Sequence, residues 1–175
     1  MIDADDFEER RQSPPVRERV RVATRATIAV AAAVITAATS LGMLLGLGRR
    51  YSTLWRPLNA VAHTVLGTRA DGVWGYQSDV TLTGCAVVLV MSAMAGVVVA
   101  ELTSSNRTFH RVIVAFGMAV VSYLVHVHIV ARSSGGLAAL LTFGELRALY
   151  LSVAIALVLG MRYAFPPLAG APRTY

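Results

Sequence analysis

The sequence predicts an all-α fold, an integral membrane four-helix bundle with a short interfacial amphipathic helix in its first outer loop. Four long apolar runs support this prediction, at residues 26–47, 80–100, 112–131 and 146–163. About 20 helical residues cross the roughly 30 Å hydrocarbon core of a bilayer, so each run is close to the length of one span. The composition agrees, because 55% of the residues are hydrophobic and only 15% are charged.

The chain divides into a charged tail at residues 1–25, a four-span domain at residues 26–165 and a short C-terminal tail at residues 166–175. All 16 basic residues are arginines. Ten of them lie on the predicted side of the two termini and six on the other. Cytoplasmic segments of membrane proteins carry the excess of basic residues. We therefore expect a bacterial inner-membrane protein with both termini on the cytoplasmic side.

The net charge of +6 does not indicate a nucleic-acid partner. The arginines stand at span ends and in the tail, where orientation signals and lipid headgroups explain them, and no basic stripe alternates with aromatic residues. The motifs of nucleophilic, phosphate-binding and metal chemistry are missing from the sequence, which predicts a protein that is not an enzyme. Cys85, the single cysteine, is expected to be a small packing residue.

Small residues recur every four positions in the first two spans. Gly42 and Gly46 share one helical face, and Gly84, Ser92 and Gly96 share another. Such faces allow helix backbones to approach closely in lipid. We expect all five residues to contact protein, either within the chain or in another integral membrane subunit.

The first outer loop is predicted to contain a helix that begins at Arg56-Pro57 and ends at Gly67, because proline suits a first helical position. One face is apolar and the other carries Arg56, Asn59 and His63, which indicates a helix in the headgroup plane. Four aromatic residues are expected to anchor the loop there, namely Tyr51, Trp55, Trp74 and Tyr76. A lid packed on the bundle explains the same features without a ligand, and this is the interpretation that we favour.

The string Arg-Pro-Leu-Asn-Ala-Val-Ala-His-Thr-Val-Leu-Gly at residues 56–67, with Thr-Leu-Thr-Gly at 81–84 and Glu101, resembles a group of small uncharacterised bacterial inner-membrane proteins. The matched region covers about a quarter of the chain. The resemblance implies a four-helix inner-membrane fold and no activity. Members of the group have histidines and aromatics early in the second span, where this chain has Val87 and Val88.

Three histidines, His63, His126 and His128, fall on the predicted outer side. Imidazoles at such a depth bind haem iron, copper or zinc, or hydrogen-bond to a quinone carbonyl. Residues two apart on an α-helix point about 200° from each other, so His126 and His128 cannot hold one ion alone. We expect no metal and no cofactor, with a haem or quinone contact as the alternative. One of the two histidines should face the bundle beside Ser122 and Tyr123.

Glu145 and Arg147 pose a question of depth. If the last helix begins at Leu146, both are headgroup residues, which is the interpretation that we favour. If it begins near Leu137, both are buried in the span, where a carboxylate usually marks an ion path or a buried salt bridge.

Two classes of function remain. The sequence favours a non-catalytic accessory or scaffold subunit of a larger inner-membrane complex, such as a respiratory or photosynthetic electron-transfer complex. The alternative is a small oligomeric carrier or channel for an ion or solute, and a second alternative is a histidine-based haem or quinone site. Membrane lipids are expected partners of any of these.

Overall fold

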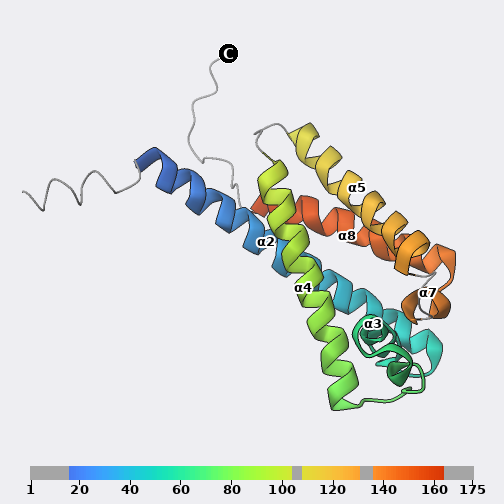
Figure 1. Cartoon of the computed structure of the whole chain (residues 1–175). Helices are drawn as coiled ribbons and strands as arrows, with labels where there is room; N and C mark the ends of the chain where they lie inside the picture. Colours follow the sequence, from blue (N-terminus) through green and yellow to red (C-terminus); the bar gives the residue numbers. More distant parts are fainter. Residues whose placement is uncertain (1–15, 104–107, 131–135, 164–175) are drawn as a thin grey trace, which may run out of the picture.

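The computed structural model describes residues 16–103, 108–130 and 136–163, and these residues form helices and connecting turns without strands (Figure 1). The predicted all-α fold with four long helices is confirmed. The long helices are α2 (Val16–Gly48), α4 (Ser78–Leu102), α5 (Thr108–Val125) and α8 (Phe143–Tyr163). The shorter elements are η1 (Arg49–Tyr51), α3 (Arg56–Leu66), η2 (Gly67–Ala70), η3 (His126–Val130) and α7 (Gly136–Leu140).

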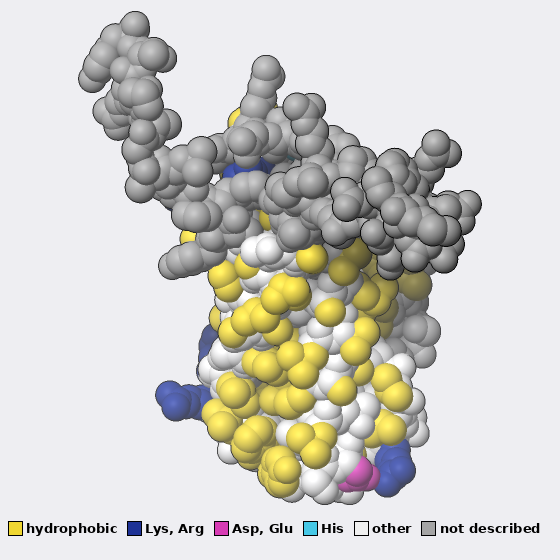
Figure 2. Space-filling model, turned by 90° about the vertical axis from the view of Figure 1, so that its left-hand side faces the viewer, with side chains coloured by type: hydrophobic (Ala, Val, Ile, Leu, Met, Phe, Trp, Pro, Cys, Tyr) yellow, Lys and Arg dark blue, Asp and Glu magenta, His cyan; other side chains and the backbone are white. Residues whose placement is uncertain are grey.

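Four helical segments are long and apolar enough to cross a membrane, namely Arg25–Tyr51, Ser78–Leu102, Phe109–Val130 and Phe143–Arg162. They coincide closely with the predicted spans. Helix α2 begins at Val16, so the described part of the predicted tail is already helical. Residues 1–15 and the predicted C-terminal tail lie outside the described residues. Figure 2 shows one face covered by apolar side chains, with the charged side chains of that view at its ends and edge.

The four long helices form an open ring. Helix α2 packs along both α4 and α8, and α5 packs on α8. Helices α4 and α5 touch each other little, and they diverge from the connection between them toward α3 and α7 (Figure 1). The ring is therefore open between α4 and α5.

Small residues bring α4 and α8 close to α2 at the end opposite α3. A Cβ added to Gly96 would overlap the carbonyl oxygen of Ala29, and a Cβ added to Gly160 would overlap Ala32. These contacts bring α4 and α8 onto the same stretch of α2, as is usual where small residues meet in membrane helices. The apolar cluster around them consists of Ile28, Ala32, Val99, Ala100, Ala115, Leu157 and Met161.

Helix α3 fills the other end of the ring. A Cβ added to Gly84 would overlap the carbonyl oxygen of Leu58, and one added to Gly136 would lie 3.2 Å from the carbonyl oxygen of Ala60. Helix α3 thus lies between the start of α4 and α7. It has the predicted bounds and ends at Gly67, whose φ of 58° and ψ of −144° suit glycine.

The predicted polar face of α3 is wrong. Asn59 is 0% exposed and His63 is 6% exposed, whereas Val65 on the predicted apolar face is 64% exposed. The reason is that residues 67–77 fold back against α3 and offer polar partners to its buried side. Helix α3 packs on the bundle as the expected lid. Of the predicted anchors, Trp74 and Tyr76 are exposed, and Tyr51 and Trp55 are half-buried.

Gly42 and Gly46 lie on the outer face of α2. Both are exposed, and an added Cβ would meet nothing within 4 Å in the described part of the chain. The same four-residue spacing therefore produces an internal contact at Gly84 and Gly96 and an outward-facing row on α2. Ser92, the remaining member of the second row, is buried at 4% exposure.

Replacing Gly96 by leucine should destabilise the fold, because the side chain would have to displace the α2 backbone. We expect a loss of about 3 kcal/mol or more, since overpacking against backbone cannot be relieved by a rotamer change. The matched control is Gly46→Leu, which enters open space. Thermal unfolding of both purified variants in detergent measures the difference, and equal melting temperatures would contradict the close contact.

A second prediction concerns orientation. The start of α2 and the end of α8 lie at the same end of the bundle, because Ala32 packs against Gly160. We expect that end to be cytoplasmic, given the arginine excess. Reporter fusions after Tyr175 and within residues 67–77 should give opposite signals. A cytoplasmic signal from the fusion within residues 67–77 would show that the orientation is the opposite of the predicted one.

Candidate ligand cavity

Asn59 joins α3 to the segment that follows it. Its Nδ2 donates hydrogen bonds to the carbonyl oxygens of Val73 at 3.1 Å and Gly75 at 2.9 Å. Its Oδ1 accepts one from Thr81 Oγ1 on α4 at 2.8 Å. The buried amide thus uses both of its donors and its acceptor, which is the condition for burying a polar group cheaply.

Arg56 and His63 hold the same segment. Arg56 Nη1 donates to the carbonyl oxygen of Asp71 at 2.6 Å, and the guanidinium lies 4.8 Å from the ring centroid of Trp74. His63 Nδ1 lies 2.6 Å from Asp71 Oδ1. The polar residues of the 56–67 string therefore have a structural role: they bind the chain to itself and fix the lid.

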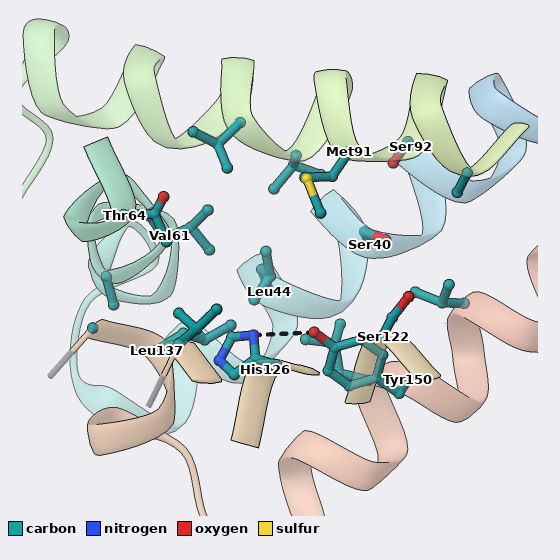
Figure 3. Close-up of a pocket in the computed structure, with 18 of the residues that line it drawn as sticks. Ser40, Leu44, Val61, Thr64, Met91, Ser92, Ser122, His126, Leu137 and Tyr150 are labelled. Carbon is teal, nitrogen blue, oxygen red and sulfur yellow. Dashed lines mark hydrogen bonds between the residues drawn. The ribbon is translucent and has the colours of Figure 1, made fainter. Parts of the chain in front are cut away.

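A cavity of about 340 Å³ lies inside the ring, above the lid. All four long helices contribute to its walls, and α3 and α7 contribute to its floor (Figure 3). The walls are mostly aliphatic. The polar side chains that line the cavity are Thr36, Ser40, His63, Thr64, Ser92, Ser122, His126 and Tyr150.

His126 and Tyr150 form the most specific polar feature of the cavity wall. His126 Nδ1 and the Tyr150 hydroxyl are 3.0 Å apart, and the dashed line in Figure 3 marks this hydrogen bond. His126 opens η3, the π-helical turn that prolongs α5, while Tyr150 lies on α8. Tyr123 packs edge-on against Tyr150 at 5.7 Å. Turns of π-helix inside α-helices are frequent at functional sites.

The His126–Tyr150 pair retains one unused donor in either tautomer of the imidazole. If the Tyr150 hydroxyl donates to Nδ1, then Nε2 carries a proton with no acceptor. If Nδ1 donates to the Tyr150 oxygen, the hydroxyl proton is unused and Nε2 is an acceptor. Nε2 is buried and has no hydrogen-bond partner among the described residues. The pair therefore retains one donor without a protein partner at the wall of the cavity.

Thr36 adds a second unused group on the opposite wall. Its residue is 2% exposed, and its Oγ1 has no hydrogen-bond partner among the residues that the structure describes. Ser40 and Ser92 lie nearby on α2 and α4 (Figure 3). Burying a hydroxyl without a hydrogen-bond partner is costly. The His126–Tyr150 pair and the Thr36 hydroxyl therefore favour a ligand that has an oxygen atom near each of them.

The structure separates the three predicted histidines. His63 and His126 line the same cavity, whereas His128 is exposed and lies outside it. Within the described ranges no three histidine, cysteine or acidic side chains come close enough to hold a metal ion. The sequence predicts a histidine of the pair beside Ser122 and Tyr123, but it does not indicate Tyr150 or Thr36. The one sequence feature that could indicate Tyr150 and Thr36 is that each carries a hydroxyl group within an apolar segment.

Glu145 lies in the first turn of α8. This helix begins between the two starts considered from the sequence, Leu137 and Leu146. Helix α8 begins at Phe143, after a break that separates it from α7. The carboxylate accepts hydrogen bonds from Thr142 N at 3.0 Å and from the Tyr51 hydroxyl at 2.6 Å, and it pairs with Arg50 at 3.2 Å. Thr142 Oγ1 in turn accepts from Glu145 N, which completes a capping box. Arg147 is exposed.

No family model, curated protein or solved structure matches this chain. The resemblance to small bacterial inner-membrane proteins therefore stays a prediction.

Replacing Asn59 by alanine should release the segment that follows α3. We expect a loss of about 1–3 kcal/mol for each buried partner left unsatisfied, and faster amide exchange over residues 71–77. The control is Val65→Ala, which changes an exposed side chain of the same helix. Hydrogen exchange followed by mass spectrometry measures both variants. An unchanged exchange rate over residues 71–77 in Asn59→Ala would show that the amide does not hold the segment.

Proposed function

We propose that this chain is a non-catalytic membrane subunit that holds an apolar, bilayer-resident molecule with carbonyl oxygens, of which a quinone is the best match. The observation that supports this most strongly is the His126–Tyr150 pair, which has an unused donor and lines a mostly aliphatic cavity. A quinone carbonyl accepts a hydrogen bond and cannot donate one. It therefore complements the pair in either tautomer.

The size and lining of the cavity suit such a ligand. Small-molecule sites are typically about 300–1,000 Å³ in volume, mostly apolar, with a few placed polar groups. The cavity, at about 340 Å³, lies at the small end of this range. It can take one substituted ring, and an isoprenoid tail would have to remain outside it.

The opening between α4 and α5 gives that tail a place. These helices diverge (Figure 1), and Met91 on α4 and Val125 on α5 both line the cavity and are exposed on the outer surface. A molecule dissolved in the bilayer can then enter sideways, without crossing the polar lid. Its second carbonyl would point toward the hydroxyl groups of Thr36 and Ser92.

A role beside other subunits is the second part of this proposal. The outward row on α2 contains Ala38, Gly42 and Gly46, all exposed and four residues apart. Such a row suits the close approach of a helix from another membrane subunit. A quinone-holding subunit would pack in this way against an electron-transfer complex of a bacterial inner membrane.

Replacing both His126 and Tyr150 by phenylalanine should weaken quinone binding about tenfold, the factor that corresponds to one hydrogen bond of roughly 1.4 kcal/mol. Titration of a short-tailed quinone into the protein in lipid nanodiscs, followed calorimetrically, measures the dissociation constant. His128→Phe is a matched control, because it makes the same change two residues away on an exposed position.

Each single change, His126→Phe or Tyr150→Phe, should weaken binding less than the double change, because the remaining hydroxyl or imidazole keeps a donor. Filling the cavity with Ser92→Leu should abolish binding. Failure of the unaltered protein to bind any quinone would rule out this ligand class, and equal losses in the double variant and His128→Phe would rule out this site.

A further inference from the structure

We propose that the outer groove between α5 and α8 is a phospholipid site, in which Arg147 binds the phosphate and one acyl chain lies along the groove. This inference does not depend on the cavity ligand. The groove lies outside the ring of helices, and it shares with the cavity only the side chain of Tyr150.

The groove has a volume of about 180 Å³ and an almost entirely apolar surface. Helix α5 contributes one side and α8 the other. The residues that form it are Phe116, Ala119, Val120, Tyr123, Leu151 and Ala154. It therefore has the chemistry of a hydrocarbon chain along its length.

Arg147 gives the groove a charged end. It lines the groove together with Leu151 and Ala154, which follow it by four and seven residues and so share its face of α8. Seven residues correspond to about 10 Å along the helix. On the antiparallel helix α5, Tyr123 and Phe116 also lie seven residues apart and line the same part of the groove. The groove thus runs from a cation at the start of the span toward the interior of the span.

Arg147 has no hydrogen bond or ion pair with any residue in the described part of the chain. The nearest carboxylate along the helix, that of Glu145, is already bound by Arg50, Tyr51 and Thr142. Residues two apart on a helix face different sides, so Glu145 cannot neutralise Arg147. The guanidinium is left to pair with an external anion.

A phospholipid is the anion that fits both the guanidinium of Arg147 and the apolar groove. A guanidinium binds phosphate oxygens through paired N–H donors. An acyl chain attached to that phosphate would fill the apolar groove, whereas inorganic phosphate would leave it empty. Arginines near the ends of membrane helices extend to the headgroup level in the same way.

Photolabelling tests the site. The full-length protein is reconstituted in nanodiscs that contain a phosphatidylglycerol with a diazirine on one acyl chain, irradiated, digested and analysed by mass spectrometry. We expect labelled peptides from Phe116–Tyr123 and Leu151–Ala154. A diacylglycerol with the same diazirine chain but no phosphate should label these peptides about fivefold less, since a single basic residue at a membrane surface contributes an effect of that size.

Two variants separate charge from shape. Arg147→Gln should reduce phosphatidylglycerol labelling of the groove about fivefold, to the level of the diacylglycerol. Val120→Trp should block the groove while the arginine remains. The controls are Arg162→Gln at the other end of α8 and Val90→Trp on the exposed face of α4, which should leave labelling unchanged. Equal groove labelling by the two lipids, or in Arg147→Gln and the unaltered protein, would overturn the proposal.

Discussion

The close contact of α2 with α4 and α8 at a single end of the bundle is the constraint on which the rest of the structure depends. Gly96 and Gly160 allow both helices to reach the backbone of α2 around Ala29 and Ala32. Without a Cβ on these glycines the axes converge there. The other end then has to be filled, and α3 fills it. The cavity is the space that remains between the convergence and the lid.

The lid is held by polar hydrogen bonds as well as by buried apolar side chains such as Leu58 and Ala62. Arg56, Asn59 and His63 direct their polar atoms at the segment after α3, and Thr81 completes the network from α4. Non-helical backbone near membrane depth is tolerated where it is buried in protein and its polar groups are satisfied. The polar side chains of α3 thus bind the segment after the helix, and the unpaired polar atoms at the cavity belong to Thr36 on α2 and His126 in η3.

Much of this architecture could be predicted from the sequence. The lengths of the apolar runs gave the four spans, and Pro57 and Gly67 marked the ends of α3. The burial of Asn59 could not be predicted, because its partners lie some 14 to 22 residues further along the chain. Spacing also could not tell Gly96 from Gly46: both rows have a period of four, and only the three-dimensional arrangement shows which one meets another helix.

The candidate site was predicted less completely. The angle between His126 and His128 indicated that only one of them faces inward, and His126 does so. Its partner Tyr150 could not be identified, because pairing α5 with α8 requires knowledge of how the spans are arranged. Thr36 was hidden for a related reason, since a hydroxyl in an alanine-rich helix normally bonds to its own backbone.

The divergence of α4 from α5 is measured most directly by the distance between spin labels on the two helices. With Cys85 replaced by serine, one labelled pair at Val98 and Ile113 reports on the convergent end and another at Leu82 and Ile129 reports on the end at α3. All four positions are exposed on the outer surface. Pulsed electron–electron double resonance in nanodiscs should give a clearly longer distance for the second pair. Equal distances for the two pairs would mean that α4 and α5 run side by side, which would contradict a cavity that opens between them.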